Sequence, residues 1–254
     1  MKKVIIIVLI AVCAIVFGYS AYQLLSYYGE DSKAESAFAN LLPEEIAGPD
    51  VTTEEGGAFS FEALLPYYEK LREQNEDMVG WLRIPGTRVS YPVMHTPQNP
   101  EFYLHHDFDK NYSVAGTIFA SDISDVNRPS DVVTLYGHRM QTGAMFGSLG
   151  EFLKKDFFEA HKDIVFDTFV GRNEYTIYGV MVEAVNVEGE FAYYYYSDFT
   201  DEEMFNGFMT GVQKFLKIER PAAKPVFGDK ILLLSTCEYT HEDGRLIVVA
   251  VLNK

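Results

Sequence analysis

The sequence contains little cysteine and is short of positive charge. Only two cysteines occur among its 254 residues, Cys13 and Cys237, which excludes a scaffold held together by several disulfides. Lysine and arginine number 21 against 37 aspartates and glutamates, so the formal net charge is −16. Because an acidic surface repels polyphosphates, we expect no nucleic-acid partner.

What is present is the composition of a folded chain. Hydrophobic residues make up 48%, aromatic residues 15% and charged residues 23% of the sequence. This balance excludes a wholly disordered, collagen-like or heptad-repeat protein. The chain is also long enough to bury a core without disulfide support.

The longest apolar run lies at the N-terminus. Lys2 and Lys3 precede an unbroken apolar stretch, residues 4–17, and weakly polar residues extend it to position 25. As a helix, residues 4–25 would span about 33 Å, enough to cross a bilayer. Because both lysines precede the run and the first acid, Glu30, follows it, we expect residues 1–25 to be a cytoplasmic start and a transmembrane signal-anchor. This predicts a single-pass protein of the cell membrane whose folded body lies on the extracytoplasmic face.

A cleaved secretory signal is the alternative for this segment. Such signals have shorter apolar regions and end in small residues at the cleavage site. Small residues occur near position 20, but Tyr19 and Tyr22 make a poor site. Beyond the anchor, we expect residues 26–59 to be an acidic extracytoplasmic tether and residues 60–254 to be the folded catalytic domain.

The folded body has the pattern of a mainly β protein. Short runs rich in β-branched and aromatic residues alternate with glycine and proline, and eight such runs suggest a closed or nearly closed barrel. The runs are 79–84, 89–94, 115–120, 132–137, 164–168, 174–185, 230–236 and 245–252.

Three helices are expected around these strands. Apolar residues at helical spacing follow Ser60, a potential cap, although Pro66 would also suit the start of a helix. Thr200 and Glu203 form a capping box before a long apolar stripe, which predicts a helix packed against the barrel. Residues 144–155 are a further helical stretch.

Candidate catalytic groups stand at the ends of apolar strands. Cys237 follows a buried-strand signal at 231–234, and His138 follows residues 132–137. Arg245 opens the next apolar run. With Cys13 in the bilayer, Cys237 has no intramolecular disulfide partner, so it is a reactive thiol, a cysteine paired with another molecule or a small buried hydrophobe.

The three residues together would supply what acyl transfer from a peptide requires. The thiolate of Cys237 would attack the carbonyl, and His138 would protonate the leaving amine. Arg245 and backbone N–H groups would stabilise the developing oxyanion. Strand ends from distant parts of the chain can converge on one rim of a barrel.

Metal binding is the weaker interpretation of the remaining polar clusters. Residues 105–107 and 241–243 contain histidines and acids, but the sequence has neither an i, i+4 histidine pair nor a Cys-x-x-Cys run. The acids Asp229, Glu242 and Asp243 could in principle hold calcium, although a solvated loop explains them as well. We therefore expect no metal and no cofactor. The tyrosines at 193–196 would either line a peptide groove or pack inward.

Several ordered motifs carry a family resemblance. They lie at 75–87, 91–93, 103–104, 116–119, 135–140, 145–149, 234–237 and 245–249. In this order and spacing the sequence, over about residues 60–254, resembles the class B sortases of Gram-positive bacteria. It departs from them at Arg139, where the family often has Asn, and at residues 98–100, where an Asp-Asn pair is usual.

The resemblance implies an eight-stranded sortase-type β-barrel with N-terminal helices and one long inserted helix. It implies that Cys237 is the nucleophile, His138 the general acid/base and Arg245 the oxyanion stabiliser of a cysteine transpeptidase. Such enzymes cleave a C-terminal sorting motif of exported proteins after Thr, hold the protein as a thioester and transfer it to an amine of the cell-wall peptide. Residues that flank the cysteine at positions where the family touches substrate are Ser235, Thr236 and Glu238.

Two other functions remain open at this point. A papain-like endopeptidase also uses Cys and His, but there the cysteine normally precedes the histidine, whereas here His138 precedes Cys237. The second is a catalytically silent binding module tethered to the membrane, in which Cys237 would be dispensable.

Overall fold

The computed structural model describes residues 2–39, 41–43, 46, 59–184, 189, 191–238 and 244–254. Nine strands in this part of the chain form one sheet. They are β1 (Met78–Arg83), β2 (Ser90–Met94), β3 (Ile118–Ala120), β4 (Val132–Tyr136), β5 (Asp163–Thr168), β6 (Gly171–Ala184), β7 (Leu216–Glu219), β8 (Ile231–Glu238) and β9 (Gly244–Leu252).

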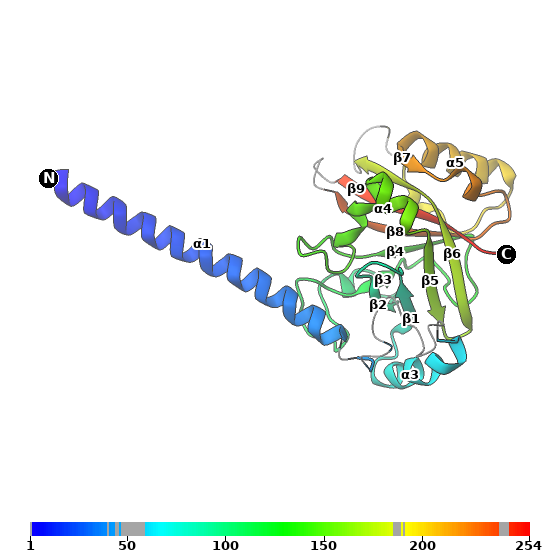
Figure 1. Cartoon of the computed structure of the whole chain (residues 1–254), viewed down its shortest axis with the longest axis horizontal. Helices are drawn as coiled ribbons and strands as arrows, with labels where there is room; N and C mark the ends of the chain where they lie inside the picture. Colours follow the sequence, from blue (N-terminus) through cyan, green and yellow to red (C-terminus); the bar gives the residue numbers. More distant parts are fainter. Residues whose placement is uncertain are drawn as a thin grey trace.

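Eight of these strands close into a barrel (Figure 1). The strand order is β5-β1-β2-β3-β4-β8-β9-β6-β7, and an additional pairing between β5 and β6 joins the two ends. The β2–β3 and β4–β8 pairs are parallel and the others antiparallel. Strand β7 lies outside the closed ring, on the edge of β6. The eight-stranded barrel confirms the fold class expected from the sequence.

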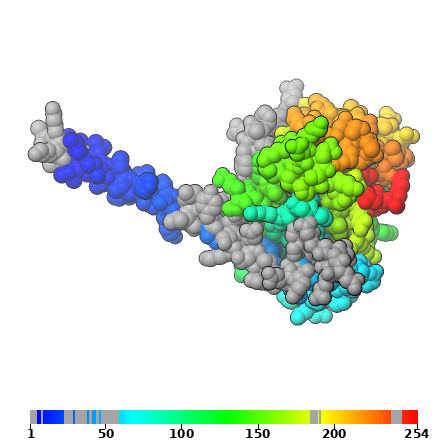
Figure 2. Space-filling model, viewed as in Figure 1, coloured from blue at the N-terminus to red at the C-terminus, as the bar shows by residue number. Residues whose placement is uncertain are grey.

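The helices are α1 (Lys2–Ala39), α3 (Phe61–Gln74), α4 (Lys155–Ala160) and α5 (Glu202–Phe215), with 3-10 turns at η1 (Phe102–Leu104), η2 (Gly147–Leu153), η3 (Tyr193–Tyr195) and η4 (Pro221–Ala223). Helix α1 projects away from the barrel, and apolar side chains along it are exposed (Figure 2). Its segment Ile5–Tyr22 is long and apolar enough to cross a membrane. The helix continues to Ala39, well into the segment expected to be a tether.

Strands β8 and β9 are buried on both faces. Leu232 and Leu234 face the core inside the barrel, whereas Ile231 and Leu233 belong to a second core beneath α5. Helix α5 contributes its buried stripe to this second core: Phe205, Phe208, Met209 and Val212. Burial on both faces accounts for the unbroken apolar run at 231–234, because such a strand has no polar side to alternate with.

Three local expectations need correction. The N-cap of α5 is Asp201, whose side chain accepts from the N–H of Met204, and not Thr200. The predicted helix at 144–155 is instead η2 followed by α4. Helix α3 starts at Phe61 after the Ser60 cap, which is the first of the two alternatives predicted, and Pro66 lies inside it. Strand β7 was not predicted, because Leu216 continues the apolar spacing of α5.

A buried carboxylate sits across the seam that closes the barrel. Asp167 on β5 is fully buried and pairs with Arg83 of β1 (3.4 Å) and Arg172 of β6 (2.7 Å). Tyr68 of α3 donates a hydrogen bond to Asp167 Oδ2 (3.1 Å) and accepts one from Arg83. Arg83 also donates to the carbonyl of Ile46 (3.1 Å). One anion therefore joins three strands, a helix and the N-terminal segment.

We predict that Asp167→Asn lowers the free energy of unfolding by about 3–5 kcal/mol, because it leaves two partly or fully buried guanidinium groups without their anion. Urea unfolding measures the loss. Glu69→Gln, which removes one exposed carboxylate from α3, is the matched control and is expected to change stability by less than about 0.5 kcal/mol. Equal effects of the two substitutions would contradict a special role for Asp167.

Candidate active site

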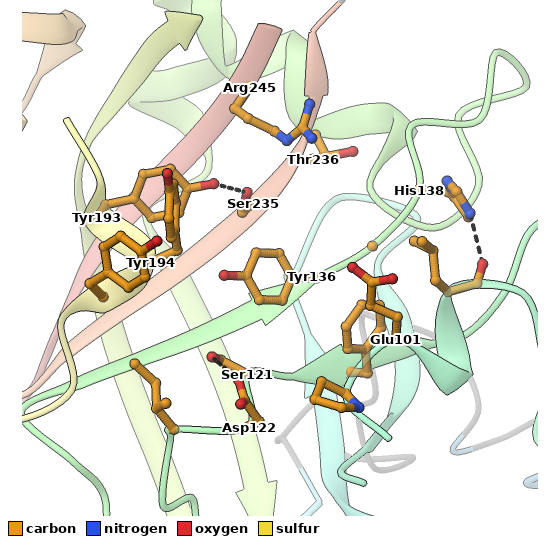
Figure 3. Close-up of a pocket in the computed structure, with 16 residues that line it drawn as sticks. Glu101, Ser121, Asp122, Tyr136, His138, Tyr193, Tyr194, Ser235, Thr236 and Arg245 are labelled. Carbon is orange, nitrogen blue, oxygen red and sulfur yellow. Dashed lines mark hydrogen bonds between the residues drawn. The ribbon is translucent and has the colours of Figure 1, made fainter. Parts of the chain in front are cut away.

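A cleft of about 500 Å³ opens at the ends of β4, β8 and β9. Three groups of residues line it (Figure 3). One wall carries Ser235, Thr236 and Arg245, and the opposite side carries Glu101, Ser121 and Asp122. The other lining residues are Pro100, Leu104, Phe119, Ile123, Tyr136, Gly137, His138, Tyr193, Tyr194 and Tyr195. The structure therefore brings His138 and Arg245, both predicted from strand ends, into one cleft with Ser235 and Thr236, which the family resemblance added.

His138 is placed by a tightly packed turn after β4. A Cβ on Gly137 would lie 2.4 Å from Ile118 Cδ1 and 2.9 Å from a ring carbon of Phe146, so only glycine fits there. The glycine is thus required by close packing and not by a left-handed backbone, since Gly137 is not among the residues with positive φ. The backbone carbonyl of His138 accepts a hydrogen bond from the N–H of Phe146 (3.0 Å), which fixes the backbone that carries the imidazole.

One ring nitrogen of His138 is already engaged. Nε2 lies 2.8 Å from the carbonyl oxygen of Leu104. Because a carbonyl only accepts, Nε2 carries a hydrogen, which leaves Nδ1 to exchange protons. Burial lowers the pKa of His138 below its usual value, the Leu104 carbonyl opposes this, and the neighbouring His105 lowers it further. The rings of His105 and His138 are 5.6 Å apart, close enough for this effect. A pKa lowered in this way favours the neutral imidazole of His138 at neutral pH.

Cys237 lies at the end of β8, opposite Arg245 of β9 in the backbone register. Residues paired in this way have Cα atoms about 4.5–5.5 Å apart. The side chains of Cys237 and Glu238 lie outside the described residues. The guanidinium of Arg245 donates to the carbonyl of Gly244 (3.1 Å) and lines the cleft beside Thr236.

The two residues before the cysteine present hydroxyls at the cleft. Ser235 Oγ and the hydroxyl of Tyr193 are 2.7 Å apart. Thr236 is 3% exposed, and within the described chain its Oγ1 has no hydrogen-bond partner. Buried hydroxyls are normally satisfied, so this one has spare hydrogen-bonding capacity directed at whatever fills the cleft.

Sequence reasoning missed much of the opposite side. Glu101 and Asp122 lie in loops and carry no pattern that marks a site. Tyr136 was located as the end of a strand and not as a residue of the cleft. The tyrosine run gave the one usable signal: Tyr193, Tyr194 and Tyr195 form the 3-10 turn η3 and line the cleft, and Tyr193 is also buried. Both alternatives for these tyrosines are therefore partly right.

The histidine and acidic clusters do not gather into a metal centre in the described part of the chain, where no group of three or more such side chains converges. Asp229, one of the residues considered for calcium, pairs with Lys254 (3.0 Å) and accepts from the N–H of Val226 (2.9 Å). The residues 241–243 lie outside the described chain. The expectation of no metal stays a prediction.

The sequence and the fold match one family. The family model for the sortase domain covers residues 82–253. Sortase B of Staphylococcus aureus (strain NCTC 8325 / PS 47) is 30% identical over 266 residues, which cover 100% of this chain and 98% of that protein.

Solved structures agree with this match. A mutant form of Clostridium perfringens sortase B superposes with a TM-score of 0.72 at 25% identity, covering 86% of this chain and 97% of that one. The Staphylococcus aureus sortase B–substrate complex gives a TM-score of 0.67 at 27% identity, covering 76% and 91%.

The environment of His138 leads to a measurable titration. We predict an NMR midpoint for His138 below 6.5, because burial disfavours the imidazolium. His105→Asn should raise this midpoint by removing a like charge at 5.6 Å, whereas His161→Gln, outside the cleft, should leave it unchanged. A midpoint at or above 6.5 in the unaltered protein would contradict the buried, neutral imidazole.

Proposed function

Because this chain belongs to the class B branch of the sortase family, whose members are cysteine transpeptidases, we propose that it joins exported proteins to the cell wall. In this proposal it cleaves a C-terminal sorting motif after Thr and carries the protein as a thioester on Cys237. The acceptor is an amine of the cell-wall peptide. His138 is the general acid/base, and Arg245 stabilises the oxyanion.

Formation of the thioester divides the work among three side chains. The thiolate of Cys237 attacks the carbonyl carbon of the scissile peptide, and the negative charge moves to the carbonyl oxygen next to the Arg245 guanidinium. Nδ1 of the neutral His138 first takes the proton of the Cys237 thiol, which produces the attacking thiolate, and then gives this proton to the leaving amine as the C–N bond breaks. The hydroxyls of Ser235 and Thr236, with Glu238, contact the bound peptide.

Transfer reverses these roles. The acceptor amine gives a proton to the neutral His138 and attacks the thioester carbonyl, and the C–S bond breaks to return the thiolate. The Leu104 carbonyl holds Nε2 in both states, so the ring keeps its orientation while Nδ1 gains and loses the proton.

One observation carries the proposal. His138, Thr236 and Arg245 line a single cleft, although they come from three separate parts of the sequence, and the backbone of Cys237 is the register partner of Arg245. The two-sided burial of β8 and β9 supports a rigid platform for the reacting groups.

We also propose that residues 4–25 anchor the enzyme in the membrane with the barrel on the extracytoplasmic face. The support is the apolar length of Ile5–Tyr22 and the lysines that precede it. This location would bring the cleft to exported substrates and to the wall precursor at the membrane surface.

We predict that Cys237→Ala and His138→Ala abolish acyl transfer, since neither replacement can attack the peptide or move a proton. Arg245→Lys should lower kcat/KM at least about tenfold, because a point ammonium does not reproduce the guanidinium fork. A peptide-library cleavage assay with mass spectrometry of the protein measures both turnover and the thioester on Cys237. Unfolding curves of the variants should match that of the unaltered enzyme.

The same assay separates the alternative functions. Peptide release without transfer to an added amine would indicate an endopeptidase. Full activity after Cys237→Ala, or after alkylation of the thiol, would indicate a silent binding module and would contradict the transpeptidase.

The N-terminal segment gives a further prediction. A chain starting at residue 26 should be soluble without detergent and keep acyl transfer, because it retains Phe38, Leu42 and Ile46, which are all buried in the core. A chain starting at residue 47 should lose on the order of 4 kcal/mol of stability, since three apolar side chains and the Arg83 partner are removed. Comparison of their urea midpoints tests this, and equal midpoints would contradict it.

A further inference from the structure

Glu101 stands out in the cleft because it is a carboxylate without a counter-charge. It is exposed at the start of η1 and forms no ion pair with any described residue. Figure 3 shows its carboxylate pointing into the cleft between Tyr136 and His138, across from the wall that carries Arg245.

A second observation shows that this end of the cleft is built to receive a polar group. Thr236 Oγ1 is buried and has no partner within the described chain, and in Figure 3 the hydroxyl points toward the side of the cleft on which His138 lies. A buried hydroxyl without a partner costs free energy unless a ligand satisfies it. A ligand with several hydrogen-bond donors, bound between Thr236 and Glu101, would satisfy both residues.

The reaction itself supplies a cation of this kind. The scissile peptide is neutral, and so is the thioester. The acceptor, in contrast, is a primary amine, which carries a positive charge and three N–H donors at neutral pH. It must come close to His138 to lose a proton before it attacks.

We propose that Glu101 is an acceptor-binding residue, which holds the incoming ammonium beside His138. The Thr236 hydroxyl donates its hydrogen to the acyl peptide and accepts a second N–H of the ammonium with a lone pair. The assignment rests on the proposed transpeptidase function. Asp122, exposed farther along the same side of the cleft, adds negative charge that attracts the cation. The ammonium first passes one proton to Nδ1 of the neutral His138, which releases it to solvent. The free amine then attacks the thioester carbonyl and gives its second proton to Nδ1 as the C–S bond breaks and the Cys237 thiolate leaves.

The test compares two nucleophiles on the thioester formed by the full-length enzyme. Glycinamide is a cation at neutral pH, whereas hydroxylamine is largely uncharged. Glu101→Gln should lower kcat/KM for glycinamide by about three- to tenfold, the size expected for one partly screened charge pair. The rate with hydroxylamine and the rate of thioester formation should each change less than twofold.

Two further measurements sharpen the result. Glu159→Gln removes an exposed carboxylate from α4, outside the cleft, and should leave both nucleophiles unaffected. Raising the salt concentration should weaken the preference for glycinamide in the unaltered enzyme and not in Glu101→Gln. Glu101→Asp, which keeps the charge, should restore part of the glycinamide rate.

Three outcomes would overturn the assignment of Glu101 and leave the proposed transpeptidase function standing. They are an equal loss with both nucleophiles, no loss with either, and a loss confined to thioester formation, which would mean that Glu101 binds a cationic side chain of the sorting peptide. If no thioester forms on Cys237 with any peptide, the proposed function fails and this assignment fails with it.

Discussion

The barrel depends on one buried anion at its seam. Beside the backbone ladders that pair β5 with β1 and β6, Asp167 joins these strands through its side chain, because Arg83 and Arg172 reach it from the two sides. Burying the Asp167 carboxylate costs desolvation free energy that only oppositely charged partners offset. The three side chains therefore favour the one strand pairing that brings them together, which is the pairing of β5 with β1 and β6. The same network binds Tyr68 of α3 and, through Arg83, the carbonyl of Ile46, so the covering elements are fixed to the ring together with the strands.

Closure in turn fixes the catalytic rim. Once β5 and β6 pair, β9 and β8 occupy the interior of the sheet and β4 lies beside β8 in parallel, which sets the ends of all three at the cleft. Both faces of β8 and β9 are covered, one by the barrel core and one by α5. Strands held in this way leave little freedom to the groups at their ends, which suits chemistry that needs an imidazole and a guanidinium in constant positions.

Much of this arrangement could be predicted from local pattern. All eight barrel strands were located to within a few residues, because apolar runs between glycine and proline are strong signals. The strand-end positions of His138 and Arg245 also predicted that they would meet. Local sequence pattern does not reveal a contact between residues that are distant in the sequence. Nothing near Asp167 indicates that Arg83, 84 residues away, will neutralise its charge. Local pattern also failed at Glu101 and Asp122, since loop residues have no periodicity that shows which way they face. Leu216 was assigned to a helix because apolar spacing alone does not reveal the edge of β6.

The long N-terminal helix sets how far the enzyme can reach. On the proposed anchoring, Ile5–Tyr22 occupies the bilayer and the helix continues to Ala39, so residues 23–39 form a stalk of about 25 Å. Phe38, at the end of the stalk, packs against Tyr91, and Leu42 enters the core just after it. The barrel is therefore carried at a nearly constant height above the lipid headgroups, and only those substrates and wall precursors that present their reactive groups within that layer would be processed.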